Sequence, residues 1–401
     1  MRTFGPSANT ERGRVTALVI GGGLLGCVVT YYLACEGMDV LLVDKGQLNL
    51  QASGQNAGSL HFQLEYRMIE RGEEHAREAA EAMPLHLHAQ RLWKDLEAEL
   101  GTSLGVVQCG GLMVAERAEE VRTLEAKIAL EREYGLDVEL LDGARLRQTA
   151  PYLGSSILAA ALCPTEGKAD PRRCAFAFAG AAARHGAAIR SRLAVVGMRR
   201  VNVFWQVSFD DGTTCLAETV VIAAGAWSGR IAAMAGTPLP VVPVGLMMSA
   251  TARTKPFLEH LLQHAGRRLS MKQNGDGNIL IGGGWPAALS EDDRGFDLEA
   301  KPQVLLSSIS GNMSTAGDVV PAVLDLPILR IWSGMTAEVP DQLPLLGEVP
   351  GCSGCFIATG GSAFTLGPTY ARILADKILG KTNLFDVTAY NPARYAEPAH
   401  A

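Results

Sequence analysis

The chain has 401 residues, which is long enough for two domains with substantial cores. Hydrophobic residues make up 48% of the chain and charged residues only 19%, a balance that favours extra surface buried against a cofactor or a partner. The net charge is −6 and no stretch is rich in lysine or arginine, which argues against a nucleic-acid-binding protein.

The beginning of the chain predicts a tail followed by a strand–helix–strand unit. Residues 1–14 lack the apolar segment of a secretion signal. No apolar run approaches the roughly 20 residues of a membrane span, so we expect a cytoplasmic protein. Residues 14–20 predict a buried strand, residues 24–37 a helix and residues 39–45 a second buried strand. This succession within about thirty residues is typical of a right-handed βαβ unit.

Three glycines between the first strand and the helix form the pattern G-x-G-x-x-G. Gly21 permits a tight turn, Gly23 lets the backbone approach a pyrophosphate, and Gly26 allows the helix to pack closely on the strand. Asp44 ends the second strand, where an acidic residue hydrogen-bonds the adenosine ribose and disfavours NADP. The pattern predicts a dinucleotide site, but it does not distinguish NAD from FAD.

The rest of the chain predicts further strands and helices joined by loops. We expect a polar loop at 46–61, and a helix at 169–186 with Asp170 as its N-cap and Pro171 in its first turn. The glycine-rich residues 281–287 are interpreted as a strand end rather than a second fingerprint, because a proline follows at once. The other predicted elements are helices over 67–100 interrupted at Pro84, strand–helix–strand over 110–141, a hairpin at 203–214 turning at Asp210–Gly212, strands at 219–228, 278–284 and 355–361, and a last helix at 368–380.

Eight cysteines are scattered through the chain, several of them in apolar runs, as is usual for reduced cytosolic thiols. Cys27, on the first helix, is expected in the core. Cys352 and Cys355 form one C-x-x-C pattern without the second ligand pair of a structural zinc site. We interpret this pattern as a thiol-bearing turn before a strand, with redox or metal chemistry as the alternative, and predict no metal site.

Besides the N-terminal fingerprint, three stretches carry a resemblance: residues 52–61, residues 220–228, and residues 332–347 leading into 357–380. Together these four motifs resemble the D-amino acid oxidase superfamily of FAD enzymes, which includes glycine oxidase and sarcosine oxidase. The resemblance covers nearly the whole chain. It implies an α/β fold of two domains, in which an antiparallel-sheet substrate domain is inserted into a Rossmann-like FAD-binding domain. The implied FAD-binding domain spans 1–95, 155–235 and 328–401, and the implied substrate or partner domain spans 96–154 and 236–327.

The segment 361–375 places small residues and a helix N-terminus at the end of a buried strand. Such an N-terminus, facing the pyrimidine edge of a flavin, would stabilise negative charge on the reduced ring by about 0.3–1 kcal/mol. The sequence therefore predicts resident FAD that is bound without a covalent link. The predicted cofactor-binding residues are Gly21, Gly23, Gly26, Asp44, Lys45, Ser53, Asn56, Ala57, Gly58, Ala224, Gly225, Trp227, Gly334, Gly361, Ala363, Phe364 and Thr365.

The resemblance implies oxidation of a carbon–nitrogen bond by hydride transfer to the flavin, followed by hydrolysis of the imine. Many members of the superfamily grip the substrate carboxylate with an arginine in a W-x-G-L-R-P context, but this chain has Thr336 at that position. Arg330 is interpreted as structural, with a displaced carboxylate clamp as the alternative. Lys272 and Arg67 are the candidate substitute cations, while Glu338 is expected to be solvated unless it meets a cationic arm of the substrate.

The predicted catalytic residues are His61, Tyr66, Lys272, Trp285 and Thr336. We expect His61 to pack beside the flavin ring rather than to carry the flavin covalently. Tyr66 and Trp285 are interpreted as pocket walls, with a place in the core as the alternative for each.

Within the superfamily, residues 52–64 and 269–286 are similar to the FAD subunits of hetero-oligomeric dehydrogenases. Those enzymes oxidise opines such as octopine and nopaline, or imino acids such as hydroxyproline. The resemblance implies partner subunits that carry electrons away, with FMN or an iron–sulfur cluster on those subunits or shared with them. The second hypothesis is a stand-alone glycine, sarcosine or D-amino acid oxidase that uses dioxygen. The third is a non-catalytic flavin-binding scaffold or electron-relay subunit.

Overall fold

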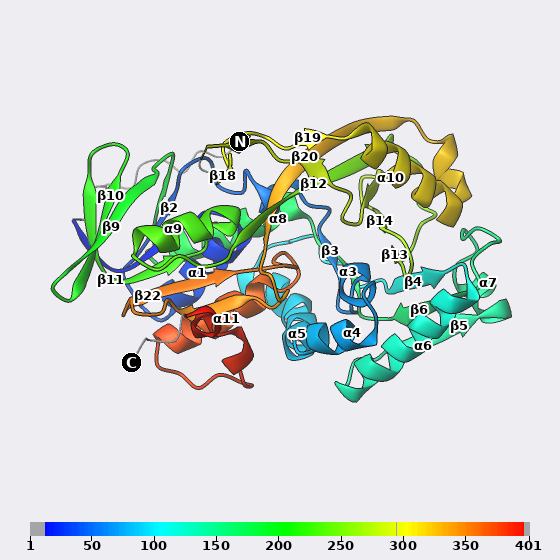
Figure 1. Ribbon diagram of the computed structural model, residues 1–401, viewed down its shortest axis with the longest axis horizontal. Helices are drawn as coiled ribbons and strands as arrows, with labels where there is room; N and C mark the ends of the chain where they lie inside the picture. The colour runs from blue at the N-terminus through cyan, green and yellow to red at the C-terminus, as the bar shows by residue number, and fades with distance from the viewer. Residues whose placement is uncertain (1–12, 294, 397–401) are drawn as a thin grey trace.

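The computed structural model describes residues 13–293 and 295–396 (Figure 1). Residues 1–12, which make up most of the predicted tail, lie outside the described residues. Two large sheets lie side by side along the longest axis of the molecule, and strands β12 (Val242–Thr251) and β20 (Ile328–Glu338) extend from the second sheet towards the first. The predicted two-domain α/β architecture, with one largely parallel and one largely antiparallel sheet, is confirmed.

The first sheet is built around the predicted βαβ unit, which consists of β1, helix α1 (Leu24–Cys35) and β2. The strands β1, β2, β8, β11 and β22 are parallel to their neighbours in this set, and β21 runs antiparallel at the edge. The strand order is β21 (Leu345–Glu348), β22 (Cys355–Thr359), β11 (Thr214–Ile222), β1 (Arg14–Ile20), β2 (Val40–Asp44) and β8 (Ala188–Ser191), with β10 (Phe204–Phe209) and β9 (Val195–Val201) added beyond β11. Because carboxyl ends of parallel strands share one edge, the segments that follow β1, β2, β11 and β22 meet there.

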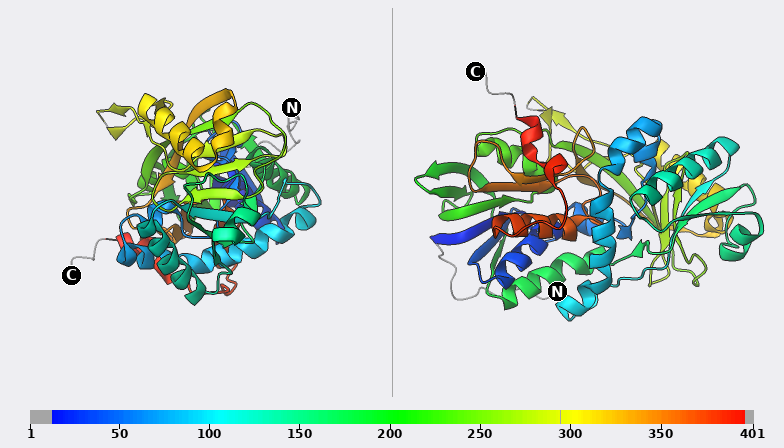
Figure 2. Two further views of the ribbon diagram at one scale, coloured as in Figure 1. Left: turned by 90° about the vertical axis from the view of Figure 1, so that its right-hand side faces the viewer. Right: turned by 90° about the horizontal axis from the view of Figure 1, so that it is seen from below.

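Helices cover both faces of the first sheet. On one face α1 packs against α8 (Pro171–Arg184) and α11 (Gly367–Ile378), and α5 (Met83–Leu100) lies against α11 (Figures 1 and 2). The short helix α9 (Ser228–Met234) covers the other face. Helix α1 is therefore buried on nearly every side, which explains its almost continuous run of apolar residues.

The second sheet is antiparallel except for the parallel pair β13–β4. Helices α6 (Ala118–Glu133), α7 (Gly143–Thr149) and α10 (Leu306–Val319) pack around it. The strand order is β20, β12, β15 (Ile279–Gly282), β14 (Ser270–Gln273), β13 (Leu261–His264), β4 (Gly111–Ala115), β6 (Ala159–Cys163) and β5 (Glu139–Asp142). The remaining elements are α2 (Ala52–Gln55), β3 (Ser59–Leu60), α3 (Tyr66–Ile69), α4 (Glu73–Ala80), β7 (Gly167–Lys168), β16 (Ala287–Ala288), β17 (Glu291–Asp292), β18 (Gly295–Phe296), β19 (Gln303–Val304) and four 3-10 turns at Gly225–Trp227, Pro321–Asp325, Thr388–Tyr390 and Pro392–Tyr395.

The strand order of the two sheets suggests domain boundaries that differ from those expected from the sequence. Strands β6 and β20 belong to the second sheet, although the ranges expected from the sequence place both in the FAD-binding domain. We propose boundaries that follow the sheets, so that β6 and β20 belong to the substrate domain.

The predicted helical interruption at Pro84 is displaced in the structure. Pro84 lies in the first turn of α5, which then runs to Leu100, because a proline needs no backbone N–H at that position. The helical region breaks instead just before α5 and at Gly72, where φ is 99°.

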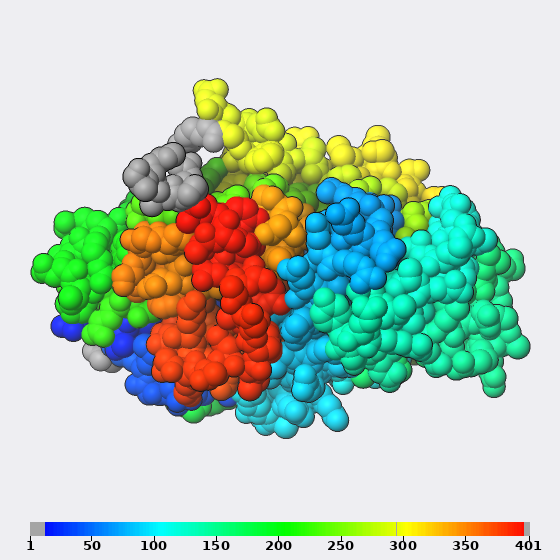
Figure 3. Space-filling model, turned by 60° about the horizontal axis from the view of Figure 1, so that its bottom comes forward, coloured from blue at the N-terminus to red at the C-terminus, as the bar shows by residue number. Residues whose placement is uncertain are grey.

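Residues from the two ends of the described chain lie side by side. The orange and red C-terminal residues sit against the blue and cyan residues of α4 and α5 (Figure 3). The hydroxyl of Tyr390 donates to the carbonyl oxygen of Glu81 (2.7 Å), and the imidazole of His88 on α5 lies 3.1 Å from the hydroxyl of Thr369 on α11. These contacts hold the C-terminal segment and the last helix against the α4–α5 region.

Candidate active site

A cavity of about 330 Å³ lies where the parallel strands of the first sheet end. Residues from the N-terminal and C-terminal parts of the described chain line this space, where the sequence predicts FAD, and we call it the cofactor cavity. Its walls include Gly21, Gly23, Asp44–Gln47, Asn49–Ser53, Leu193–Val195, Ala223–Trp227, Glu299, Met335–Ala337, Thr359, Gly360 and Ala363. Segments that are hundreds of residues apart in the sequence thus enclose one space.

The glycines of the fingerprint are required by close backbone contacts. Gly21 has a φ of 113°, and a Cβ atom there would lie 2.4 Å from the carbonyl oxygen of Ala223. A Cβ atom on Gly26 would lie only 1.8 Å from the carbonyl oxygen of Gly21. Gly26 therefore does not line the cavity but lets α1 approach β1 so that the helix N-terminus reaches it.

Asp44 lies on the cavity wall and fixes the turn beside it. Its carboxylate accepts hydrogen bonds from the N–H groups of Gly22 (2.6 Å) and Gly46 (2.7 Å). The hydroxyl of Ser53 accepts from the N–H of Leu24 at the start of α1 (2.9 Å). A carboxylate held in this way keeps further acceptor positions for a ligand, since each ionised carboxylate has about four lone-pair sites.

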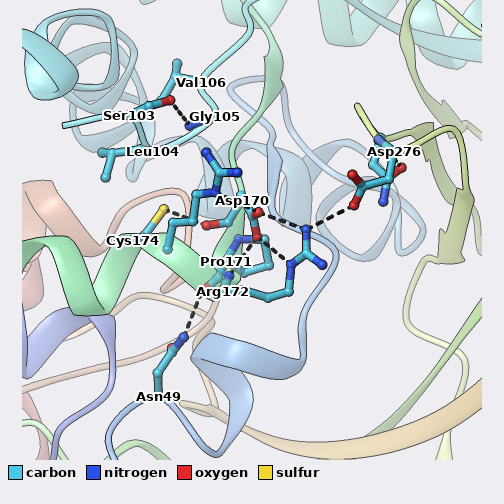
Figure 4. Close-up of polar contacts among 12 residues, drawn as sticks. Asn49, Ser103, Leu104, Gly105, Val106, Asp170, Pro171, Arg172, Cys174 and Asp276 are labelled. Atoms are coloured by element: carbon cyan, nitrogen blue, oxygen red, sulfur yellow. Dashed lines mark hydrogen bonds and ion pairs between the residues drawn. The ribbon is translucent and has the colours of Figure 1, made fainter. Parts of the chain in front are cut away.

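Asn49 is a cavity residue that no sequence motif indicated. Its Nδ2 donates to the carbonyl oxygen of Pro171 in the first turn of α8 (2.8 Å), as Figure 4 shows. Its Oδ1 is buried and has no partner among the described residues. A buried acceptor of this kind normally has a donor, so the cavity offers an acceptor to a bound hydroxyl or amino group.

The first turn of α8 also connects the two sheets. The carboxylate of Asp170 accepts from the N–H of Arg172 (2.9 Å) and confirms the predicted N-cap. The guanidinium of Arg172 bridges Asp170 (2.9 Å) and Asp276 (3.3 Å), which lies between β14 and β15 of the second sheet (Figure 4).

Lys45, Trp227 and Glu299 gather at one part of the cavity wall. The ammonium of Lys45 lies 3.9 Å from the centre of the Trp227 ring and 2.6 Å from the carboxylate of Glu299. The indole N–H of Trp227 donates to the same carboxylate (2.9 Å). Glu299 follows the β17–β18 hairpin, so this cluster, which we call the latch, connects that segment to the first sheet.

Several predicted cofactor residues shape the loops around the cavity without lining it. Asn56 donates to the carbonyl oxygens of Ala52 (3.0 Å) and Ser53 (2.7 Å) and accepts from the N–H of Gly58 (2.6 Å). A Cβ atom on Gly334 would lie 2.5 Å from Oε1 of Gln55, so this glycine lets the Gln55 side chain approach β20 closely. Ala57 stands between Asn56 and Gly58 in the same turn and is absent from the cavity wall.

Among the predicted cofactor residues just before α11, some line the cavity and others only shape the loop beside it. Ala363 lines the cavity, whereas Phe364 points to α5 and stacks on Trp93 with ring centres 5.6 Å apart. The hydroxyl of Thr365 donates to the carbonyl oxygen of Ser59 (3.1 Å). Gly361 accepts at its carbonyl oxygen from the hydroxyl of Tyr370 (3.0 Å).

His61 lies in a polar network between the two sheets. Its Nδ1 lies 2.8 Å from Nε2 of Gln263 on β13, and its Nε2 lies 3.0 Å from the hydroxyl of Ser270 on β14. Since the amide of Gln263 donates, the ring proton is assigned to Nε2, which donates to Ser270. Both ring nitrogens are therefore engaged with residues of the second sheet.

Lys272 follows Ser270 by two residues and shares its face of β14. Its side chain is buried, with 2% of the residue exposed, and it forms no ion pair with any described residue. Burial, together with the like charge of Lys168, lowers the pKa of Lys272 to about 7. Gln263 and Ser270, which the sequence analysis missed, thus lie with His61 and Lys272 at one face of the second sheet.

The other predicted substrate residues are spread over the molecule. Thr336 lines the cofactor cavity. Tyr66 on α3 is absent from the cavity wall, and burial raises its pKa. Trp285 packs on Gly311 of α10 and donates to the carbonyl oxygen of Arg268 (3.1 Å), so it does not reach the cavity either. Arg330 is exposed on β20 beside the ring of Trp332.

A family model described as "DAO: FAD dependent oxidoreductase" matches residues 16–377 of the chain. The chain belongs to the DAO family. It is 27% identical over 389 residues to glycine oxidase of Geobacillus kaustophilus, with 95% of this chain and 97% of that protein covered. The crystal structure of glycine oxidase from Geobacillus kaustophilus matches with a TM-score of 0.84 and 26% identity, covering 96% of this chain and 100% of that one.

Two further relatives differ in their organisation. A subunit of the opine oxidase of Rhizobium meliloti is 26% identical over 401 residues, with 95% of this chain and 98% of that protein covered. Mitochondrial dimethylglycine dehydrogenase of Mus musculus is 24% identical over 408 residues, and the alignment covers 96% of this chain but 45% of that protein. The chain thus spans about half the length of the latter relative.

Membership of the DAO family makes the chain an FAD-dependent oxidoreductase. The described residues fit this cofactor: the glycine turn leaves room for a pyrophosphate at the N-terminus of α1, Asp44 presents a carboxylate, and Asn49 presents an unpartnered acceptor. We propose, for each residue of the predicted set that lines the cavity, a direct contact with FAD.

Replacement of Asp44 by alanine should weaken FAD retention. We expect a loss of roughly 1.5–3 kcal/mol, the usual contribution of hydrogen bonds to a charged acceptor. The measurement is flavin content after dialysis, with the dissociation constant from flavin fluorescence. Unchanged occupancy would contradict the assignment of Asp44 to the ribose.

Removal of the latch should weaken FAD retention less than Asp44→Ala does. Lys45→Ala leaves Glu299 and Trp227 without their cation, and half-exposed ion pairs contribute about 0.2–1 kcal/mol. We therefore expect FAD to dissociate up to about fivefold faster at low salt, with the difference shrinking as salt screens the pair. Equal dissociation rates at low salt would show that the latch does not retain the cofactor.

The predicted turn at Cys352 and Cys355 is present, and both thiols are free and buried. Cys355 begins β22, and burial raises its pKa. Cys27 is buried in the core, as expected. Among residues 13–293 and 295–396, no group of three or more potential His, Cys, Asp or Glu ligands could hold a metal ion. In the same part of the chain, no helix has the length and apolar character needed to span a membrane.

Proposed function

We propose that this protein oxidises the C–N bond of a secondary amino acid, either a D-opine such as octopine or nopaline or an imino acid. We further propose that it works as the catalytic subunit of a hetero-oligomeric dehydrogenase in the cytoplasm. The observation that carries the proposal is Lys272, a buried cation without an ion-pair partner in the described chain, set two residues from the Ser270–His61 contact. The similarity to the opine oxidase subunit of Rhizobium meliloti supports both the substrate class and the partner subunits.

In this mechanism FAD, held by the residues of the cofactor cavity, would supply the acceptor for the hydride from the substrate carbon. The ammonium of Lys272 binds the substrate carboxylate and replaces the guanidinium that position 336 lacks. Because Nε2 of His61 donates to Ser270, the hydroxyl proton of Ser270 is free to donate to a second acceptor on the substrate. The apolar residues Met335 and Ala337 beside Thr336 exclude water from the cavity wall. Water then hydrolyses the imine to a carbonyl compound and an amine.

The His61 network is joined closely to the cofactor cavity. Ser59 lies six residues after the cavity residue Ser53, and its hydroxyl is 3.5 Å from that of Ser270. The hydroxyl of Thr365, two residues after the cavity residue Ala363, accepts a weak hydrogen bond from the N–H of His61 (3.4 Å). These short connections support a substrate bound between the cavity and the face of β14.

The test is anaerobic addition of octopine, nopaline and hydroxyproline to the purified holoprotein, with glycine and sarcosine alongside. We expect an opine or imino acid to bleach the visible absorbance of oxidised flavin, and an artificial dye to restore it much faster than dioxygen. If no secondary amino acid bleaches the flavin, the proposal fails.

A stand-alone oxidase is the second candidate, supported by the similarity to glycine oxidase along nearly the whole chain. This second hypothesis would be supported if the isolated chain oxidised glycine or sarcosine and formed one hydrogen peroxide for each substrate molecule consumed. Partner subunits are tested separately by purification from the native host with an inventory of subunits, flavins and iron.

A further inference from the structure

Arg67 joins two loops that meet behind one wall of the cofactor cavity. Its Nη1 donates to Oε1 of Gln342, in the loop between β20 and β21 (2.7 Å). Its Nη2 donates to the hydroxyl of Ser362, in the loop between β22 and α11 (2.9 Å). That hydroxyl donates in turn to the carboxylate of Glu65 (2.5 Å), which lies 3.5 Å from the same guanidinium. Arg67 is therefore not a free cation, as a substrate clamp would require.

Both loop residues held by Arg67 have left-handed backbones. Gln342 has a φ of 61° and Ser362 a φ of 52°. Residues other than glycine rarely adopt such conformations, and they persist only where the surroundings enforce them. Gln342 is also fixed from its other side, where Nε2 lies 2.9 Å from the imidazole of His75.

The turn that contains Ser362 forms part of the cavity wall. Gly360 and Ala363 line the cavity on either side of Ser362. Between them, a Cβ atom on Gly361 would lie 3.1 Å from Nη2 of Arg67, so the guanidinium packs directly beneath the turn. The position of the 360–363 turn thus depends on where Arg67 holds the Ser362 hydroxyl.

The two charges also lie close to the cavity. Although burial raises the pKa of a carboxyl group, the positive charge of Arg67 lowers the pKa of Glu65 to about 2, so the carboxylate is ionised at neutral pH. The nearby imidazole of His86 is fully buried, and burial lowers its pKa to about 4, so it adds no charge there. A cation and an anion in contact with each other therefore stand behind the turn.

We propose that Arg67 and Glu65 are positioning residues for the flavin: they fix the 360–363 turn against the ring of bound FAD and balance the charge behind it. The inference rests on the FAD dependence of the family and on the flavin ring lying at this wall, but not on the identity of the substrate. Reduced flavin carries negative charge, so an unbalanced cation here stabilises the reduced form and an unbalanced anion destabilises it.

The test compares Glu65→Gln, Arg67→Gln and Arg67→Lys as holoproteins. Glu65→Gln keeps an acceptor for Ser362 and removes the negative charge. It should favour the reduced flavin by about tenfold, which is about 30 mV for a two-electron couple. Arg67→Gln should shift the midpoint potential in the opposite direction and weaken FAD binding about tenfold. Arg67→Lys should nearly keep the potential but weaken FAD binding, because one ammonium does not hold both loops.

The readouts are the midpoint potential by equilibration with a reference dye and the FAD dissociation constant by fluorescence. The matched control is Arg77→Gln, which breaks an exposed pair with Glu73 on α4 and should leave both quantities unchanged. If Arg67→Gln does not fold, Glu65→Gln and Arg67→Lys decide the question. Wild-type potential and FAD affinity in both of these variants would overturn the proposal, even if their thermal stability fell. Neither readout uses a substrate, so this outcome is independent of the reaction proposed above.

Discussion

Replacing Gly26 by alanine is expected to yield a protein that purifies without bound FAD. The new Cβ atom would lie 1.8 Å from the carbonyl oxygen of Gly21 and 3.5 Å from Cβ of Ala223. The first of these is a backbone atom of the turn that faces the cavity, so relief requires α1 to move away from β1. Overpacking of a core typically costs about 1–3 kcal/mol, and here it also displaces the helix N-terminus from the pyrophosphate. The measurement is the ratio of flavin to protein, with thermal unfolding of the apoprotein.

Gly180→Ala is the matched control for this prediction. Gly180 also lies in a helix, α8, but a Cβ atom there meets only the end of the Arg184 side chain, 3.9 Å away. Alanine is a better helix former than glycine, so this variant should keep its FAD and gain up to about 1 kcal/mol of stability. A Gly26→Ala protein with as much flavin as Gly180→Ala would contradict the role assigned to the third glycine.

The βαβ unit and its fingerprint were predictable because their signals are local. The predicted strand at 14–20 has the bounds of β1, and Asp44 is the last residue of β2, as expected. Tight turns, helix packing and a terminal acid are properties of adjacent residues. The resemblance extended the prediction to the far end of the chain, where Ala363 lines the same cavity as Gly21 and Gly23.

The orientation of individual side chains was less predictable. A motif marks a segment, but whether Phe364 faces the cavity or Trp93 depends on α5, which is about 270 residues earlier in the chain. Similarly, Glu299 joins the latch and Glu65 joins Ser362 through contacts that no local pattern indicates. Asn49, Gln263 and Ser270 were missed for the same reason.

Lys272 shows what a sequence pattern leaves undetermined. The sequence predicts two candidate cations, Lys272 and Arg67, that could replace the missing arginine clamp. Only the fold distinguishes them, because Arg67 is paired with Glu65 while Lys272 is buried on β14 without an ion-pair partner among the described residues. A buried charge of this kind is costly, and groups with such perturbed pKa values gather at functional sites.

Replacement of Lys272 by methionine should abolish tight substrate binding and stabilise the apoprotein. Loss of a charged hydrogen bond costs about 1.5–3 kcal/mol, so the substrate dissociation constant should rise roughly tenfold to more than a hundredfold. Stability should move in the opposite direction, because methionine fills a similar volume without a buried charge. A gain in stability coupled to a loss of affinity distinguishes a substrate-binding cation from a structural one.

The pH dependence of this stability gain has a defined sign. The pKa of Lys272 falls from 10.5 to about 7 on folding, so between these values the unfolded chain holds one proton more than the folded one. Wild-type stability should therefore rise with pH across this window, and the advantage of Lys272→Met should be largest below about pH 7 and vanish near pH 10.5. Its upper bound is on the order of 5 kcal/mol, at 1.36 kcal/mol for each pKa unit.

Denaturant unfolding of the apoproteins from about pH 6 to about pH 10 measures this difference. Lys94→Met, at an exposed position on α5, is the control and should change neither the stability profile nor substrate affinity. If Lys272→Met is less stable than the wild type at low pH, the ammonium has a stabilising partner within the protein. Its role is then structural, and it does not bind the substrate carboxylate. If stability rises but affinity for every amino acid tested is unchanged, the buried cation is real and the substrate lies elsewhere.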